Sequence, residues 1–172
     1  MALRDIRLLV LDVDGVLTDG GIAVHADGSQ SVTFHVRDGA GIKYLQRAGI
    51  EVAILSGRSI PAVEHRAREL GIQDILQGHL AKVSTWETLL KKHGLRDAQA
   101  AYMGDDLADV PLLRRAGWSA APADATEDAR NAARFVTRAA GGRGAVREAS
   151  EKILRARGLW DGIRETWGAL PR

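Results

Sequence analysis

The residues best suited to chemistry in this sequence are carboxylates that stand beside glycines. Asp12 and Asp14 follow an apolar run, and Asp105 and Asp106 follow Gly104. Two like charges 4 Å apart repel by about 4 kcal/mol at an effective dielectric constant near 20, so grouped carboxylates need a cation between them. Oxygen ligands without cysteine or a nearby histidine favour Mg²⁺.

A hydroxyl and a lysine accompany these carboxylates. Ser56, Gly57 and Arg58 form one short polar group, and Lys82 opens a helical pattern. Mg²⁺, a lysine, a hydroxyl and glycine N–H groups together make a phosphate site. One carboxylate can then attack phosphorus and form an aspartyl-phosphate. The chemistry indicated is phosphoryl transfer.

Each group taken alone also fits an ordinary structural role. Asp-Gly is a common turn pair, a serine often caps a helix, and most lysines are solvated. "GDD" (104–106) alone fits any loop. The four groups favour one site because they occur together, each at the expected end of a strand or helix.

The surrounding pattern predicts an α/β fold. Strands are expected at 7–13, 51–57 and 100–106, and helices at 39–49, 60–71, 82–94 and 107–117. This alternation predicts a three-layer, Rossmann-like parallel sheet with helices on both faces. The carboxyl ends of its strands would bring the four groups to one rim.

Residues 20–36 interrupt this alternation. Apolar residues alternate on either side of Asp27-Gly28, which predicts a β-hairpin inserted after the first strand. A lone hairpin is marginal in water, so it either packs on the domain or pairs with copies of itself in an oligomer.

Composition sets limits on the function. The 172 residues suit a single domain over 1–172, and 45% hydrophobic with 27% charged residues is ordinary for a globular protein. The net charge of +2, without a basic block, predicts no nucleic-acid partner. No apolar stretch is long enough to cross a membrane. The absence of cysteine fits the cytoplasm.

The motifs resemble those of a known family. "DVDGVLTDG", "SGR", Lys82 and "GDDLAD", in this order, resemble the four motifs of the haloacid dehalogenase superfamily. "FHVRDGAGI" (34–42) and "AAGGRGAVREA" (139–149) resemble its 3-deoxy-D-manno-octulosonate 8-phosphate (KDO 8-phosphate) phosphatases. The resemblance runs from about residue 6 to residue 157. It implies a Mg²⁺-dependent phosphatase of lipopolysaccharide sugar synthesis that lacks a large cap domain.

The resemblance also implies roles for individual residues. Asp12 would be the nucleophile and a Mg²⁺ ligand, and Asp14 the general acid and base, with its carbonyl on the metal. Ser56 and Lys82 would bind the phosphoryl group. Asp105 would be the remaining metal carboxylate, supported by Asp106 and Asp109. Substrate would be contacted by Asp14, Lys82 and the positions His35, Val36, Arg37, Asp38, Gly39, Lys43, Gly57, Arg58, Arg66 and Arg143.

Several of these positions fit a purely structural role equally well. Arg58 and Arg66 lie eight apart on one helical pattern, within roughly 80° of each other, although Arg66 alone fits a surface arginine. Asp38 could equally cap the helix at 39–49, and His35 could be an ordinary strand residue. The glycine-rich 141–148 could either approach a site or form a simple turn.

In this family the hairpins associate into a homotetramer, so some residues would act on a neighbouring subunit's site. The sequence departs from the family at Ser56, where threonine is frequent, and at Ala81, where a polar residue usually precedes the lysine. The tail at 158–172 goes beyond the resemblance; its Trp160 and Trp167 fit one helix face.

Two other functions compete with this one. A phosphatase for a sialic-type nine-carbon sugar 9-phosphate would share the catalytic motifs. Arg37, Arg58 and Arg143 favour the eight-carbon acid. A catalytically silent tetramerising module would share the fold, and the intact motif aspartates and Lys82 argue against it.

Overall fold

A six-stranded parallel sheet forms the centre of the molecule in the computed structural model, which describes residues 3–168. The strand order is β5-β4-β1-β6-β7-β8. Every neighbouring pair in this sheet is parallel. The strands are β1 (Leu8–Leu11), β4 (Glu51–Leu55), β5 (Asp74–Leu76), β6 (Ala100–Met103), β7 (Trp118–Ala121) and β8 (Phe135–Val136).

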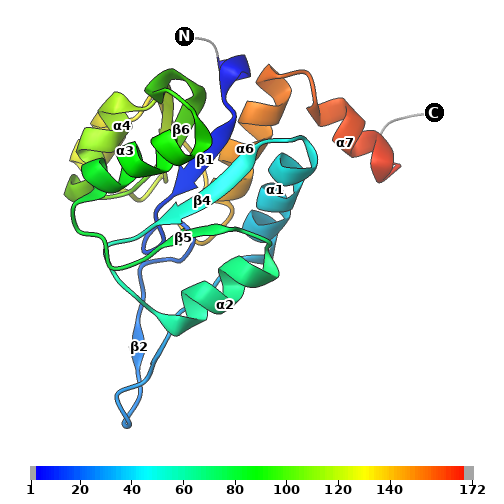
Figure 1. Cartoon of the computed structure of the whole chain (residues 1–172). Helices are drawn as coiled ribbons and strands as arrows, with labels where there is room; N and C mark the ends of the chain where they lie inside the picture. Colours follow the sequence, from blue (N-terminus) through cyan, green and yellow to red (C-terminus); the bar gives the residue numbers. More distant parts are fainter. Residues whose placement is uncertain (1–2, 169–172) are drawn as a thin grey trace.

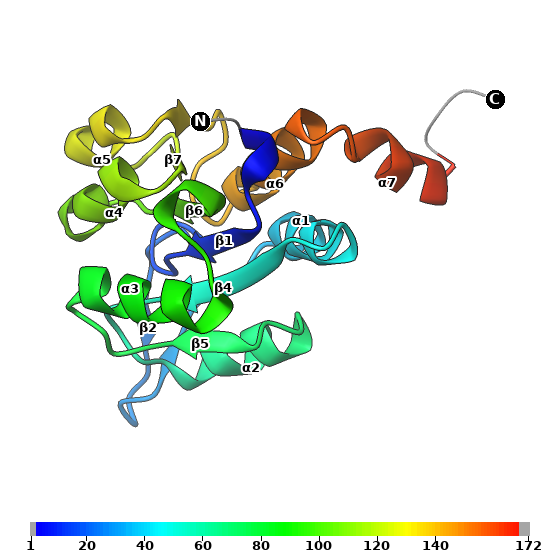
Figure 2. The same ribbon diagram turned by 45° about the horizontal axis from the view of Figure 1, so that its top comes forward.

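Helices cover both faces of this sheet, as Figures 1 and 2 show. One face carries α1 (Val36–Arg47), α2 (Pro61–Glu69) and α6 (Ala145–Ala156). Helix α7 (Trp160–Thr166) follows α6 and projects away from the sheet. The other face carries α3 (Lys82–His93), α4 (Val110–Arg115) and α5 (Glu127–Ala132). Short 3₁₀ turns occur at Leu3–Asp5, Asp97–Gln99 and Leu107–Asp109. The predicted three-layer α/β fold is confirmed.

The alternation of side chains along β1 explains the two cores. Leu9 and Leu11 pack against α1, α2 and α6, whereas Leu8 and Val10 pack against α3 and α4. All four side chains are fully buried. A central parallel strand is buried on both faces, which is why its sequence is continuously apolar.

The inserted hairpin is present with shorter strands than predicted. β2 (Ala23–Val24) and β3 (Gln30–Ser31) pair antiparallel around Asp27-Gly28, and the ribbon extends away from the body (Figure 1). Gly28 has φ +82°, which suits this turn. The expectation that Val36 belongs to the hairpin is wrong, because the N–H groups of Asp38 and Gly39 bond to the carbonyl of His35 and start α1 there.

Other boundaries shift by a few residues. The helix predicted at 107–117 is a 3₁₀ turn at Leu107–Asp109 followed by α4. Strands β5, β7 and β8 have only two to four residues and were not predicted. In the tail, Trp160 is buried against Tyr44, whereas Trp167 is 63% exposed. Positions 169–172 of the predicted tail lie outside the described residues.

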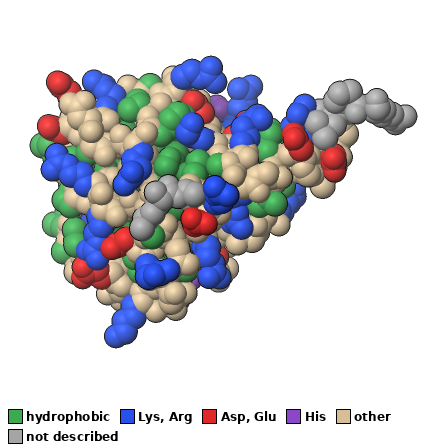
Figure 3. Space-filling model, turned by 90° about the horizontal axis from the view of Figure 1, so that it is seen from above, with side chains coloured by type: hydrophobic (Ala, Val, Ile, Leu, Met, Phe, Trp, Pro, Cys, Tyr) green, Lys and Arg blue, Asp and Glu red, His purple; other side chains and the backbone are tan. Residues whose placement is uncertain are grey.

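Charged side chains of both signs are mixed on the surface seen in Figure 3. Lysine and arginine lie among aspartate and glutamate there, as expected for a chain with a net charge of +2. Each helix within residues 3–168 is too short or too polar to cross a bilayer.

Candidate active site

Three adjacent strands deliver the motif residues to one rim of the sheet. β1 lies between β4 and β6, so the loops after these strands meet at their carboxyl ends. The resulting cleft has a volume of about 340 Å³. It is lined by Asp12, Asp14, Gly15, Gly20, Ser56, Gly57, Arg58, Leu80, Lys82, Asp105, Asp106, Ala108 and Asp109.

Lys82 joins two of the carboxylates. Its Nζ lies 2.9 Å from Oδ2 of Asp12 and 2.6 Å from Oδ1 of Asp109. Burial by itself lowers the pKa of Lys82, but the charges of both aspartates outweigh it and raise that pKa above its usual value. Lys82 is therefore a fixed positive charge beside Asp12. The missing cap at Ala81 does not prevent this reach, although α3 starts without a side-chain cap.

Asp109 uses both of its oxygens in bonds within the protein. Oδ1 accepts from Lys82 and from the hydroxyl of Tyr102 at 2.6 Å. Oδ2 accepts from the N–H groups of Asp105 and Asp106 at 2.9 and 3.1 Å. Asp109 thus connects Lys82, Tyr102 and the Asp105 loop at the wall of the cleft.

Asp12 and Asp105 are the carboxylates suited to a cation. Together with Asp109 they place oxygens within 4.8 Å of one another. Burial, then the negative charge of Asp109, raises the pKa of Asp12 to about 6. Burial, then the charges of Asp12 and Asp109, raises the pKa of Asp105 to about 7. Oδ1 of Asp14 is buried without a hydrogen-bond partner. This oxygen-rich, electronegative set fits Mg²⁺.

Mg²⁺ binding is expected to weaken as the pH falls from 8 to 5. Protons compete with the metal once the pH drops below the raised pKa values of Asp105 and Asp12. For each carboxyl group that must lose a proton to bind Mg²⁺, the apparent affinity for Mg²⁺ falls about tenfold per pH unit below the pKa of that group. Titration calorimetry of the metal-free protein at several pH values measures this slope.

The raised pKa values of Asp12 and Asp105 also determine how the stability of the metal-free protein changes with pH. A raised folded-state pKa favours the folded state at low pH, and this contribution disappears as the pH rises from about 4 through 6 and 7. Mg²⁺ should therefore raise the melting temperature more at pH 8 than at pH 5. Asp105→Asn should flatten the difference, and equal increments at both pH values in the unchanged protein would contradict the assignment.

Ser56 and Arg58 follow β4 into the cleft. The Ser56 hydroxyl accepts from the N–H of Arg58 at 3.2 Å. The Arg58 guanidinium lies 3.3 Å from Oδ2 of Asp14 and 2.8 Å from the side-chain oxygen of Gln30. Gln30 belongs to β3, so the hairpin contacts the site of its own chain. Sequence reasoning missed Gln30 because a polar hairpin residue carries no motif.

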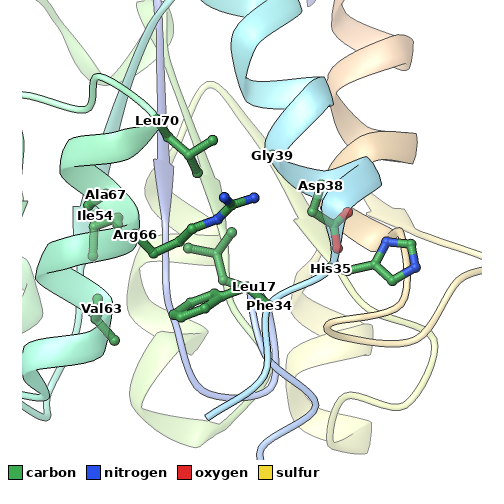
Figure 4. Close-up of a pocket in the computed structure, with 10 residues that line it drawn as sticks. All are labelled: Leu17, Phe34, His35, Asp38, Gly39, Ile54, Val63, Arg66, Ala67 and Leu70. Carbon is green, nitrogen blue, oxygen red and sulfur yellow. The ribbon is translucent and has the colours of Figure 1, made fainter. Parts of the chain in front are cut away.

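Arg58 and Arg66 do not share a helix. Helix α2 begins at Pro61, after Ile60 in extended backbone, so Arg58 stays in the loop after β4. The helical spacing used to relate them was therefore wrong. Arg66 instead points from α2 toward α1 at Gly39, beside a small separate pocket (Figure 4). A Cβ on Gly39 would collide with the Arg66 guanidinium.

Asp38 holds α6 rather than its own helix. Its carboxylate accepts from the N–H groups of Gly144 and Arg147 at 3.1 and 2.8 Å, and the residue is 1% exposed. The alternative role as cap of the 39–49 helix is thus wrong. In Figure 4, Asp38 lies between Arg66 and His35. The Nδ1 atom of His35 is buried without a hydrogen-bond partner.

The remaining predicted contacts lie elsewhere in this chain. Val36 and Arg37 are exposed at the start of α1. Lys43 lines a different pocket, beside Gly71 and the amino ends of β4 and β5. Arg143 pairs with Asp19 at 3.0 Å. Within one chain these positions do not meet the cleft carboxylates.

The glycine-rich turn before α6 packs against the loop that follows β1. The N–H of Gly142 bonds to the carbonyl of Val16 at 2.9 Å. A Cβ on Gly141 would collide with the backbone of Gly15, and Gly142 has φ +58°. The turn therefore approaches the backbone of the Asp14 loop, which sequence alone left open.

The chain is similar to known phosphatases. Residues 71–148 match the family of haloacid dehalogenase-like hydrolases. It is 45% identical to the 3-deoxy-D-manno-octulosonate 8-phosphate phosphatase KdsC of Haemophilus influenzae, over 91% of this chain and 87% of that protein. It is 46% identical to KdsC of Escherichia coli, over 92% of this chain and 84% of that protein.

Solved structures agree with this relationship. A 3-deoxy-D-manno-octulosonate 8-phosphate phosphatase from Moraxella catarrhalis, in complex with magnesium, phosphate and KDO, is 39% identical with a TM-score of 0.94. The match covers 96% of this chain and 95% of that one. The cobalt-bound phosphatase of Haemophilus influenzae is 43% identical with a TM-score of 0.92, over 98% and 99% of the two chains. The protein belongs to the 3-deoxy-D-manno-octulosonate 8-phosphate phosphatase family of haloacid dehalogenase-like hydrolases.

Proposed function

We propose that this protein is a Mg²⁺-dependent phosphatase that hydrolyses KDO 8-phosphate to KDO and phosphate. The observation that carries the proposal is the pairing of Lys82 with Asp12 at a rim that also holds Asp14 and Asp105. Relatives with this activity, and a neighbour bound to magnesium, phosphate and KDO, support the substrate. Such an enzyme would act in lipopolysaccharide sugar synthesis.

The cleft residues account for two successive displacements at phosphorus. A carboxylate oxygen of Asp12 forms a bond to phosphorus while the bond to the sugar oxygen breaks, and Asp14 gives that oxygen a proton. Asp14 then takes a proton from water, whose oxygen attacks phosphorus and frees Asp12. Lys82 and the Ser56 hydroxyl donate to the phosphoryl oxygens. Mg²⁺, held by Asp12, Asp105 and the carbonyl of Asp14, would offset the phosphate charge.

The arginine in the cleft supports a sugar acid as the substrate. Arg58 already lies in the cleft, and its guanidinium can bind a carboxylate in a bidentate manner. Arg37 is exposed at the start of α1. Arg66, Lys43 and Arg143 do not reach the cleft of their own chain. We infer that any contact they make with substrate would be at a neighbouring subunit's site.

A substrate panel tests the proposal. Phosphate release is measured with Mg²⁺ from KDO 8-phosphate, sialic-type 9-phosphates and hexose phosphates. KDO 8-phosphate should give a kcat/KM at least about tenfold above the others, which corresponds to about 1.4 kcal/mol in transition-state binding. Preference for a nine-carbon acid would overturn the substrate, and no release from any ester would overturn the activity.

We also propose a homotetramer assembled through the hairpin at 20–36. Val24 and Ile22 are 67% and 41% exposed, and two two-residue strands have little stability alone. Val24→Asp should dissociate the tetramer, because it places a charge in a buried apolar contact. Light scattering after size exclusion measures the mass. Val136→Asp, on β8, is the control and should leave the tetramer intact; a monomeric unchanged protein would contradict the proposal.

We place the enzyme in the cytoplasm. The sequence has no cysteine that would need an oxidising compartment, and the described helices include no membrane span.

A further inference from the structure

Tyr102 carries a hydroxyl buried in the sheet. It lies on β6, one residue before the strand ends, and it is 0% exposed. Its ring packs edge-on against Trp86, with 6.0 Å between centroids. Phenylalanine could provide that packing equally well. A hydroxyl at such a position needs a hydrogen-bond partner, since burying it alone is unfavourable.

The partner of this hydroxyl is Asp109. Tyr102 donates to Oδ1 at 2.6 Å, and the same oxygen accepts from Lys82. Burial, and then the charge of Asp109, raises the pKa of Tyr102 well above its usual value, so the phenol remains a donor. Tyr102 itself does not line the cleft.

Asp109 in turn connects two parts of the site. Oδ1 holds Lys82, and Oδ2 holds the N–H groups of Asp105 and Asp106. Gly104 makes room for this carboxylate, because a Cβ there would collide with the side chain of Asp109. The orientation of one buried carboxylate therefore sets the lysine and the backbone of the Asp105 loop together.

We propose that Tyr102 is a positioning residue for the phosphatase reaction. Its hydroxyl fixes the rotamer of Asp109, and Asp109 places both the Lys82 ammonium and the Asp105 loop. The expected effect of Tyr102 on turnover rests on the proposed function. The expected effect of Tyr102 on the Asp105 loop does not depend on any substrate.

Tyr102→Phe tests the proposal because it removes one oxygen and keeps the ring. Without this donor the Asp109 carboxylate can rotate, so its bonds to the N–H groups of Asp105 and Asp106 should lengthen. Amide hydrogen exchange at these two positions, measured in the metal-free protein, should accelerate about tenfold, because a bond to a charged acceptor is involved. With KDO 8-phosphate and saturating Mg²⁺, kcat should fall about tenfold while KM changes less than twofold.

Ser119→Ala is the matched control. Ser119 faces Tyr102 in the register of β6 and β7, is 0% exposed, and accepts from the N–H of Arg134 outside the cleft. The Ser119→Ala variant also loses a buried hydroxyl, so its melting temperature should fall. Its kcat and the amide hydrogen exchange at Asp105 and Asp106 should not change. Unchanged exchange in Tyr102→Phe would overturn the proposal, as would a change of equal size in Ser119→Ala. If no ester is hydrolysed, the proposed function fails while the exchange measurement still decides the role of Tyr102.

Discussion

Asp12→Asn is expected to reduce phosphate release by about 10⁴-fold or more, because an amide oxygen cannot replace the attacking carboxylate. Asp12 is 8% exposed and its Oδ2 lies 2.9 Å from Lys82, so its position at the end of β1 is fixed. Steady-state release from KDO 8-phosphate measures the loss. Trapping of an acyl-phosphate with hydroxylamine should give no signal in this variant.

The fold should survive this change. Burial and the charge of Asp109 make the ionised Asp12 unfavourable in the metal-free protein above pH 6. A neutral asparagine should therefore leave the melting temperature at pH 8 no lower than about 3 °C below that of the unchanged protein. Asp14→Asn is the comparison variant, because it keeps the nucleophile. Its acyl-phosphate should form more slowly without the general acid, but it should still be trapped. Turnover by Asp12→Asn above a hundredth of the original rate would exclude Asp12 as the nucleophile.

The cleft carboxylates could be placed from the sequence because a parallel strand restricts where its last residue can lie. Leu8–Leu11 and Ala100–Met103 are fully buried strands, and each is followed within two residues by a motif aspartate. Adjacent parallel strands bring such residues to the same rim. The local sequence pattern therefore predicted both the strands and the placing of the motif aspartates at their carboxyl ends.

Arg66 was harder to place than Arg58, because Arg58 follows the end of β4 whereas no strand end fixes Arg66. The helical spacing of Arg58 and Arg66 ignored Pro61, which starts α2 after Arg58. The sequence left open a role for Asp38 as the cap of its own helix, yet Asp38 accepts hydrogen bonds from the start of α6, more than a hundred residues away. Contacts between residues so distant in sequence depend on how helices pack across the sheet, and no local pattern encodes them.

Short elements were missed for a similar reason. Trp118–Ala121 has only one large apolar residue, its tryptophan, followed by three small ones, and Phe135–Val136 has only two residues. Both become strands because β6 offers an unpaired edge to β7, and β7 offers one to β8. The sequence also offered no reason to single out Tyr102, because one tyrosine within an apolar strand is typical of a core residue. Only the structure shows that its hydroxyl donates to Asp109.

Lys82→Met is expected to reduce kcat by about 10²–10³-fold, because it removes a buried positive charge that faces the phosphoryl group. Methionine has a similar length without the charge, so the packing of α3 changes little. Phosphate release over a range of pH values measures the effect. Without the lysine, the pKa of Asp12 should rise further, since the Lys82 charge lowers it in the unchanged protein. The acidic limb of kcat/KM should therefore move to higher pH.

Lys92→Met is the control on the same helix. Lys92 pairs with Asp74 at the opposite end of the sheet and is 61% exposed, so its loss should leave kcat and the pH profile unchanged. Lys82→Met leaves Asp109 buried with Tyr102 and two backbone N–H groups as donors, so this carboxylate keeps partners and the domain should fold. A folded Lys82→Met protein with kcat within threefold of the original would show that Asp12 attacks phosphorus without help from the lysine, and that the ion pair serves the stability of the sheet alone.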